Sequence, residues 1–525
     1  MVDVHLVVLV HGLWGNKTHF DYINSQIEEF KSQNKQTNDQ EELVVYRTQG
    51  NEGYKTLDGI DVCGLRVAHE IIEQINIITK KVDQQVNKIS IIGYSLGGLI
   101  SRYAVGILYH QNYFKLIKPI NFITFCTPHV GVLTPGSNIS VRFFNTIVPK
   151  LISLSGKQMF LKDKSGSNEH PLLYSMAQPN SVFFKALSEF KYLSLYANTI
   201  NDRRTSWWTA GISICDPFIN IDENSSLNDL NYNYIDAYEP IILDANSKII
   251  ISNRTINKEL IPPTTEEIVQ NFWIRKSKWI IVLFNMLIFA PLWVIGFIIS
   301  GVMESFKSHR RINLTLRENS NFLSSITDLI IEEEGEDEAS EEDEDDALSE
   351  LDFRTPAESI HSLDKNFNFQ EFDYNVNSAL HDQADNLMES VWDAMTSKDQ
   401  IKSAQLSLAY DLKHDKSDTN IDVISTDDND NVPGLKSTIN ELSYFDKDSE
   451  FYKIDALKPF IINLNDDQLE IIKNLNSLKW SKFPLLIRHT KSTHSASIVR
   501  DLNDKTLFEG KVVIKHWIEN VFKLE

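Results

Sequence analysis

The pentapeptide Gly93-Tyr94-Ser95-Leu96-Gly97 decides the fold of this chain. It follows the apolar run Lys88-Ile89-Ser90-Ile91-Ile92 and precedes a helical pattern over residues 98–109. A G-x-S-x-G sequence between a strand and a helix predicts a tight, strained turn that exposes the serine hydroxyl. The glycines are required because side chains would clash inside such a turn. We therefore predict that Ser95 is a nucleophile.

Short apolar runs alternate with longer stretches of helical periodicity on both sides of this turn. Further strand candidates lie at residues 6–10, 120–125 and 192–197, and residues 64–80 have the spacing of a helix. Nearly continuous apolar strands are typical of a sheet that is covered on both faces. The alternation over residues 4–218 predicts a doubly wound, mostly parallel α/β sheet.

The first predicted strand ends in the loop Leu9-Val10-His11-Gly12-Leu13-Trp14-Gly15. A loop of this HG type supplies one backbone N–H to an oxyanion hole, and the residue after the nucleophile supplies another. The predicted donors are the backbone N–H groups of Leu13 and Leu96, each contributing roughly 3 to 4 kcal/mol in the transition state. We interpret His11 as structural, because the expected chain order is serine, acid, histidine.

The acid of a serine triad is expected at the end of a strand that follows the nucleophile. Asp202 meets this condition, because it comes just after the predicted strand at residues 192–197. Asp163 has no strand before it and Asp216 lies next to Pro217, so both fit surface or turn positions better. The alternative interpretation of Asp202 is a turn aspartate that caps the next element.

Two histidines, His489 and His494, lie in the polar loop after the apolar run at residues 483–488. A base histidine belongs in such a loop, because it exchanges a proton with serine and leaving group while the acid holds its ring. We favour His494, since small residues and the apolar pair Ile498-Val499 follow it and would anchor a helix. His489 is the alternative.

Length, charge and cysteine content exclude several classes of protein. The 525 residues are enough for a large core with insertions. The net charge of -22 argues against a nucleic-acid partner, because phosphate contacts need clustered Lys and Arg. The three cysteines fit neither a disulfide framework nor a zinc cluster, so a reducing compartment is expected. No basic and apolar leader precedes the first strand, which predicts no secretory signal.

Several stretches resemble a known family, the fungal serine esterases of the lipase type, which includes a lipid-droplet phospholipase of yeast. They are VHLVVLVHGLWGN (4–16), IIGYSLGGLISRYAVGIL (91–108), FITFCTPHVGV (122–132), YANTINDRRTSWWTA (196–210) and HSASIVRD (494–501). The resemblance is good over about the first 218 residues, loose over about the last 70, and absent between. One departure is Tyr94, where many members of the family have histidine.

The resemblance implies an α/β-hydrolase fold. It also implies that the serine of GxSxGG, the aspartate of the NDR motif and the late histidine form the triad, here Ser95, Asp202 and His494. The implied activity is that of a phospholipase at lipid droplets or at the cytosolic face of an intracellular membrane, without a metal or organic cofactor. A triacylglycerol or monoacylglycerol lipase and an acyltransferase are alternatives. A competing interpretation from a different functional class is a non-catalytic membrane adaptor.

The most hydrophobic stretch of the chain covers residues 279–303. At about 1.5 Å per residue it is long enough to cross a hydrocarbon core of about 30 Å. A single crossing would separate Ser95 and Asp202 from His494, so the triad could not assemble. Pro291 divides the stretch and basic residues flank both ends, which favours a hairpin anchor with both ends in the cytosol. A buried or lid-like element and a true span are the alternatives.

The predicted organisation places the two parts of the catalytic domain at opposite ends of the chain. Much of the acidic excess falls within residues 332–346, a like-charge block that cannot bury a core. We expect the first catalytic part at residues 1–218, a connecting segment at 219–270, the anchor at 271–311, an acidic and largely disordered insert at 312–453, and the second catalytic part at 454–525.

Overall fold

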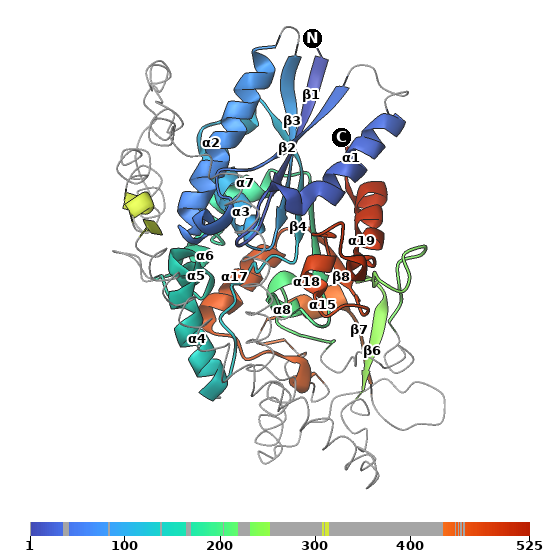
Figure 1. Ribbon diagram of the computed structural model, residues 1–525. Helices are drawn as coiled ribbons and strands as arrows, with labels where there is room; N and C mark the ends of the chain where they lie inside the picture. Colours follow the sequence, from blue (N-terminus) through green and yellow to red (C-terminus); the bar gives the residue numbers. More distant parts are fainter. Residues whose placement is uncertain are drawn as a thin grey trace, which may run out of the picture.

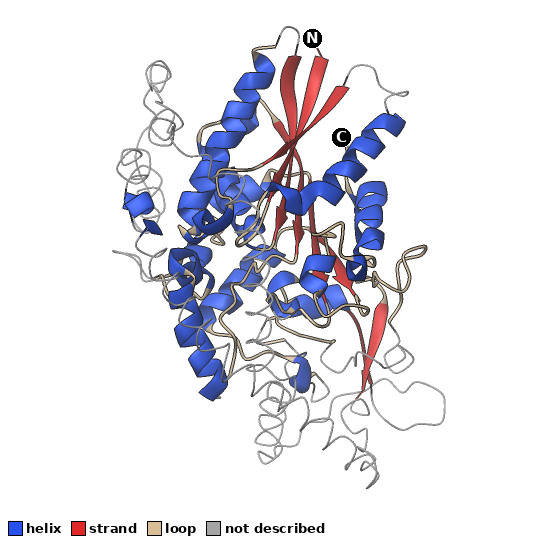
Figure 2. Cartoon of the chain, in the orientation of Figure 1, coloured by secondary structure: helices blue, strands red, loops and turns tan. Residues whose placement is uncertain are grey.

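The structure is a computed structural model (Figure 2). It describes residues 2–34, 41–81, 84–136, 139–163, 170–202, 204–218, 232–252, 307–308, 310–313, 434–446, 448–449, 451, 454 and 457–525.

A six-stranded sheet forms the centre of the fold (Figure 1). In spatial order its strands are β2 (Glu41–Arg47), β1 (Val2–Val10), β3 (Gln84–Tyr94), β4 (Lys118–Phe125), β5 (Tyr192–Asn198) and β8 (Trp480–Leu485). All five neighbouring pairs are parallel. The α/β fold with a parallel sheet is therefore confirmed, and it is consistent with an α/β-hydrolase.

Helices cover both faces of this sheet, as Figure 1 shows. One layer contains α2 (Ile60–Thr79), α3 (Leu96–His110) and α7 (Val182–Ser188), and the other contains α1 (Asp21–Asn34) and α19 (Gly510–His516). The remaining helices are α4 (Ile139–Leu151), α5 (Ser153–Met159), α6 (Leu172–Ser175), α8 (Trp207–Ala210), α15 (Ile439–Ser443), α17 (Asp466–Asn476) and α18 (Thr493–Ala496).

Strand β1 explains the two layers, because successive side chains of a strand point to opposite faces. Val4, Leu6 and Val8 belong to the core beneath α2 and α3. Val7 and Leu9 belong to the core beneath α1 and α19. The run is continuously apolar because both faces of the strand are buried.

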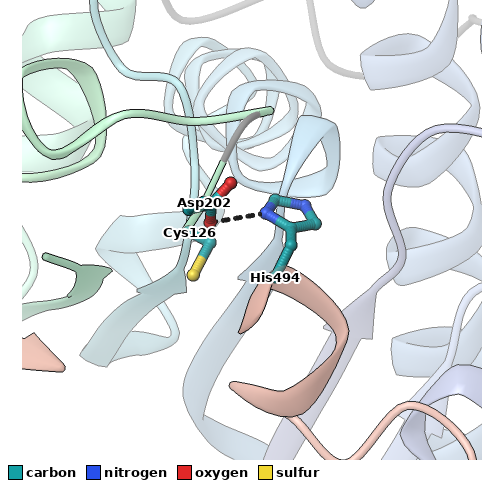
Figure 3. A group of neighbouring side chains, drawn as sticks. All are labelled: Cys126, Asp202 and His494. Atoms are coloured by element: carbon teal, nitrogen blue, oxygen red, sulfur yellow. Dashed lines mark hydrogen bonds and ion pairs between the residues drawn. The ribbon is translucent and has the colours of Figure 1, made fainter. Parts of the chain in front are cut away.

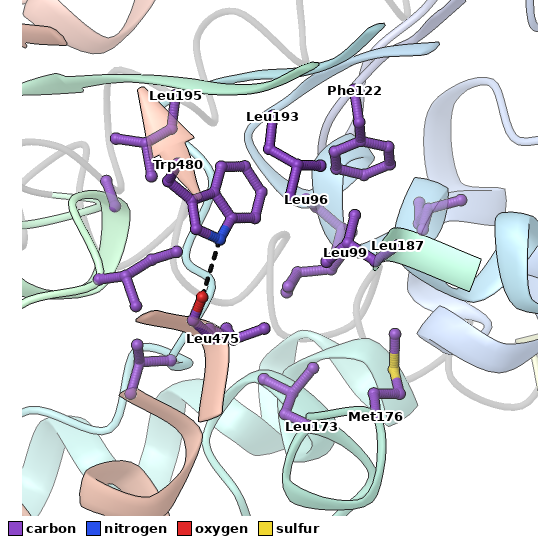
Figure 4. Packing of buried hydrophobic residues seen from close by; sticks show 14 of the residues in the cluster. Leu96, Leu99, Phe122, Leu173, Met176, Leu187, Leu193, Leu195, Leu475 and Trp480 are labelled. Atoms are coloured by element: carbon purple, nitrogen blue, oxygen red, sulfur yellow. Dashed lines mark hydrogen bonds between the residues drawn. The ribbon is translucent and has the colours of Figure 1, made fainter. Parts of the chain in front are cut away.

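The C-terminal segment completes the same sheet. β8 pairs with β5 in parallel register, Tyr196 opposite Phe483. Trp480 of β8 packs near Leu193 and Phe122 of the N-terminal part, and its indole N–H donates to the carbonyl of Leu475 at 3.0 Å (Figure 4). Residues from the two ends of the chain therefore share one hydrophobic core.

A short antiparallel pair lies outside the main sheet. β6 (Lys248–Ser252) pairs with β7 (Gly434–Thr438), and α15 follows directly. Thr438 and Glu441 form a capping box at the start of α15, which stabilises the helix. This strand and helix lie inside the range 312–453 that is predicted for the insert.

Two elements of the structure are absent from the sequence predictions. β2 was not predicted, because Glu41 and Glu42 begin it and its burial is mixed. α19 is the second, and a π-helical turn at Trp517–Val521 follows it directly.

The hydrophobic stretch at residues 279–303 lies outside the described residues, as does most of the predicted acidic insert. Among the residues that the structure does describe, no helix combines the length and the apolar character needed to cross a membrane.

Candidate active site

Ser95 occupies the turn between β3 and α3. Its backbone has φ 54° and ψ −128°, a conformation that L-residues rarely adopt and that stores strain. The N–H of Ser95 donates to the carbonyl of Phe125 at 2.9 Å, which fixes the turn to β4. Ser95 also lies at the N-terminus of α3, where the helix dipole favours negative charge. This geometry is suited to a serine that attacks an acyl carbonyl, because the carbonyl oxygen of the substrate then becomes a negatively charged oxyanion.

The glycines around Ser95 are required by close backbone contacts. A Cβ at Gly97 would lie 2.1 Å from the carbonyl oxygen of Val10. A Cβ at Gly93 would lie 2.4 Å from the Cα of Gly98. Both distances are far below van der Waals contact, so the turn forms only with glycine at these positions.

The loop after β1 lies against Ser95. A Cβ at Gly12 would come within 2.7 Å of Ser95 Cβ and 3.3 Å of Ser95 Oγ. The loop is fixed in position, because the N–H of Trp14 donates to Thr56 Oγ1 at 2.9 Å. The predicted donor Leu13 lies in this loop and the predicted donor Leu96 is the first residue of α3, where backbone N–H groups lack intrahelical partners.

Asp202 lies four residues beyond the end of β5, and its side chain is 1% exposed. Oδ1 accepts the backbone N–H of Thr205 at 2.9 Å, and Oδ2 accepts Nδ2 of Asn198 at 2.9 Å. Burial by itself raises the pKa of the carboxyl, but His494 and these hydrogen bonds outweigh it and lower the pKa to about 2. The carboxylate is therefore charged and fixed in position.

His494 lies in α18, and its Nδ1 is 2.9 Å from Oδ2 of Asp202 (Figure 3). The Thr205 hydroxyl lies 3.2 Å from the same nitrogen. Nε2 is buried and has no hydrogen-bond partner among the described residues. Since Nδ1 donates to the carboxylate, Nε2 carries the lone pair and can accept a proton.

Tyr94 positions His494 beside the serine turn. The two ring centroids lie 5.1 Å apart, and the Tyr94 hydroxyl donates to the backbone carbonyl of His494 at 3.2 Å. The position before Ser95, where the family often has histidine, therefore contributes a contact to His494.

The alternative candidates have other partners. Nδ1 of His489 lies 2.7 Å from Oε1 of Glu509, and its side chain is 65% exposed. Asp163 accepts the backbone N–H of Leu172, the first residue of α6. The structure brings Asp202 and His494 together, whereas His489 and Asp163 contact other residues.

Asp216 and His11 also have local roles. Asp216 accepts the N–H of Phe218 at 3.0 Å, within its own turn. Nδ1 of His11 lies 3.1 Å from the carbonyl of Gly12, and burial lowers the pKa of His11 to about 4, so its ring is neutral near pH 7.

The sequence did not predict the residues that bind Asp202. Asn198 and Thr205 both bind the Asp202 carboxylate, and Cys126, directly after β4, lies next to it. Asn198 and Thr205 fall within the stretch YANTINDRRT, where polar residues around Asp202 are the available signal. Cys126, Asp202 and His494 could together hold a metal ion.

Comparison with known proteins agrees with this geometry. Residues 2–216 match the family described as "Putative serine esterase (DUF676)". "Putative lipase ROG1" of Saccharomyces cerevisiae is 32% identical over 269 residues, which cover 49% of this chain and 36% of that protein. "Putative lipase YDL109C" of the same yeast is 32% identical over 201 residues, which cover 38% of this chain and 28% of that protein.

The matched part therefore spans only about a third of the length of these relatives, 36% and 28%. A solved structure of phospholipase PlaB from Legionella pneumophila in complex with thio-NAD shares 14% identity over 40% of this chain and 41% of that chain, with a TM-score of 0.23. Over residues 2–216 the predicted resemblance is confirmed, and this part of the chain is similar to the serine esterases of that family.

Proposed function

We propose that this chain is a lipid ester hydrolase of the α/β-hydrolase fold, with Ser95, Asp202 and His494 as its triad. The observation that carries the proposal is the 2.9 Å contact between His494 and Asp202 beside the strained turn of Ser95. The esterase family match over residues 2–216 supports the same reaction class.

In the proposed reaction, Ser95 Oγ attacks the acyl carbonyl and its proton passes to Nε2 of His494. Asp202 holds the ring in the required tautomer and stabilises the imidazolium that forms. Backbone N–H groups of Leu13 and Leu96 bind the oxyanion. The imidazolium then protonates the leaving alcohol, and water hydrolyses the acyl-enzyme with His494 as base.

The proposed substrates are glycerophospholipids, with acylglycerols as the second group to test. The names of the yeast relatives, both described as lipases, support a lipid ester. The apolar residues 279–303 support a reaction at a lipid surface, because such a stretch needs a membrane, a droplet or a large core to cover it. The proposed location is a lipid droplet or the cytosolic face of an intracellular membrane.

The proximity of Asp202 and His494 also limits how the chain between them meets a membrane. Groups 2.9 Å apart lie on the same side of any bilayer. A chain that leaves from one and returns to the other crosses the bilayer an even number of times or not at all. The short distance between Asp202 and His494 therefore supports the hairpin anchor at residues 279–303 and opposes a single span there.

The proposal is tested by fatty-acid release from phospholipid vesicles and triacylglycerol emulsions by the purified full chain. We expect the wild type to hydrolyse one of them, and Ser95→Ala and His494→Ala to lose activity by about 10⁴-fold or more. His489→Ala is the matched control and should retain activity, because its ring pairs with Glu509.

A fluorophosphonate probe separates failure of the substrate assignment from failure of the catalytic one. An activated serine reacts with this probe whatever its natural acyl group, so the wild type should be labelled and Ser95→Ala should not. Labelling without lipid hydrolysis would retain the serine hydrolase and reject the lipid substrates. A wild type that is inert in both assays would favour the non-catalytic adaptor.

A further inference from the structure

Cys126 lies beside the Asp202–His494 pair but has no part in the proposed reaction. It is fully buried at the end of β4, and Figure 3 shows its sulfur close to both side chains. A sulfur, a carboxylate oxygen and a ring nitrogen of these three residues all lie within 4.8 Å of one another. One ion between them could therefore contact all three with small side-chain movements.

The chemical types of the three ligands determine which metal ions this cluster can bind. Thiolate, imidazole and carboxylate are the three ligand types that bind Zn²⁺ in proteins, and thiolate also favours the softer Cd²⁺. Ca²⁺ and Mg²⁺ prefer sites built from several oxygen ligands, whereas only one of these three residues, Asp202, offers oxygen. The cluster is therefore suited to Zn²⁺ or Cd²⁺ and not to the common hard cations.

The surrounding contacts agree with a metal site. Nδ2 of Asn198 donates both to Cys126 Sγ at 3.2 Å and to Asp202 Oδ2 at 2.9 Å. Hydrogen bonds of this kind from an outer shell orient metal ligands and tune their affinity. The Thr205 hydroxyl donates a third hydrogen bond, 3.1 Å from Asp202 Oδ2.

Charge balance favours a divalent ion at this buried position. A bound metal deprotonates a coordinating thiol. One thiolate and one carboxylate then neutralise the two charges of the ion, and His494 stays neutral, which avoids a net buried charge.

We propose that Cys126, Asp202 and His494 form an inhibitory site for Zn²⁺ or Cd²⁺, an inference that rests on the proposed function of His494 as base. The ion binds Cys126 Sγ, Asp202 Oδ2 and His494 Nδ1. The thiol proton is released to solvent and the Nδ1 proton moves to Nε2, so each ion bound releases one proton and no electrons move. His494 then carries a proton on Nε2 and cannot accept the proton of Ser95.

Metal binding is tested in the Ser95→Ala background, because this variant keeps the three ligands and its readout does not depend on turnover. Cd²⁺ should produce a thiolate-to-cadmium charge-transfer band that saturates at one ion per chain. Adding Cys126→Ser should abolish the band. Adding Cys215→Ser instead should leave it unchanged, because Cys215 is equally buried but lies outside the cluster. A band that survives Cys126→Ser, or no band at all, overturns the site.

Asp202→Asn in the Ser95→Ala background provides a second ligand removal should Cys126→Ser fail to fold. Loss of an outer-shell partner alone weakens metal affinity about 10- to 100-fold, so loss of the Asp202 ligand should weaken Cd²⁺ binding by at least about tenfold. Unchanged Cd²⁺ affinity in this variant would exclude Asp202 as a ligand.

Inhibition is tested with Zn²⁺ and Mg²⁺ on the active wild type and Cys126→Ser. Zn²⁺ should inhibit the wild type, a chelator should restore activity, and Cys126→Ser should need at least about tenfold more Zn²⁺. Equal inhibition of both proteins by Zn²⁺, or inhibition by Mg²⁺, would reject the inhibitory site. Should the wild type hydrolyse no ester, the proposed function fails while the cadmium titration still decides the metal site.

Discussion

The guanidinium group of Arg311 donates to both carboxylate oxygens of Asp58, with Nε 3.0 Å from Oδ2 and Nη2 2.8 Å from Oδ1. Arg66 donates to Oδ2 at 2.8 Å, and the Ser308 hydroxyl donates to Oδ1 at 2.6 Å. The Asp58 side chain is fully buried. A buried carboxylate is stable only when it is paired in this way.

Arg311→Leu is therefore expected to destabilise the protein by about 3 kcal/mol, because it leaves the buried charge of Asp58 partly uncompensated. The neighbouring Arg310 is exposed, so Arg310→Leu is the matched control and should change stability by no more than about 0.5 kcal/mol. The measurement is the free energy of unfolding in urea. Equal values for the two variants would show that the Asp58 contact contributes nothing.

Asp202→Asn should lower the rate of ester hydrolysis by about 10⁴-fold, because an amide at this position favours the wrong tautomer of His494. Asp216→Asn is the control, since Asp216 accepts the N–H of Phe218 in its own turn. The comparison uses kcat/KM on whichever ester the wild type cleaves. If both variants keep wild-type activity, Asp202 is not the acid.

Ser95→Gly should be more stable than Ser95→Ala by about 1 kcal/mol, because glycine adopts φ 54° and ψ −128° without the steric cost that a Cβ carries. Both variants remove the hydroxyl, so the difference in unfolding free energy reports the strain carried by the Cβ, less the greater entropy that glycine loses on folding. Equal stability would indicate that the turn relaxes when the hydroxyl is removed, and that the strain depends on serine itself.

Local signals allowed most of the sheet and the serine turn to be predicted from the sequence. The motif at residues 93–97 lies within one strand-turn-helix unit, so its interpretation needs no distant residue. The choice between His489 and His494 is different, because both lie in one polar loop and only tertiary packing brings one of them to Asp202. Asn198 and Thr205 lie within four residues of Asp202 in the sequence, but several polar residues surround Asp202 there and only the fold shows which of them bind its carboxylate.

Residues 434–443 contain a sequence signal for the start of a helix, although they lie in the range predicted to be disordered. Thr438 and Glu441 have the spacing of a capping box, which predicts the start of a helix. The acidic and polar composition of the preceding residues outweighed it. By contrast, the pairing of β7 with β6 joins segments far apart in the sequence, and no local pattern indicates it.

Lys482 gives a prediction for the pH dependence of stability. It is buried, and its Nζ donates to the carbonyl of Ile212 at 3.0 Å and to Asn476 Oδ1 at 2.7 Å, with no carboxylate among these contacts. Burial lowers the pKa of Lys482 to about 7 in the folded protein, whereas the unfolded chain keeps the ordinary value of about 10.5.

Between these two values the unfolded state binds more protons, so the contribution of Lys482 to stability rises with pH. Below a pH of about 7 the group is charged in both states, and its unfavourable contribution stays constant. The unfolding free energy of the wild type relative to Lys482→Met should therefore increase by about 2 to 3 kcal/mol from a pH of about 7 to a pH of about 9.

Lys479→Met is the matched control, because Lys479 is exposed and its substitution leaves the buried contacts of Lys482 in place. Urea unfolding at a series of pH values measures all three proteins. A flat difference for Lys482→Met would mean that the folded protein keeps this ammonium charged throughout. Its carbonyl and amide contacts would then compensate the burial fully, and Lys482 would act only as a structural donor to Ile212 and Asn476.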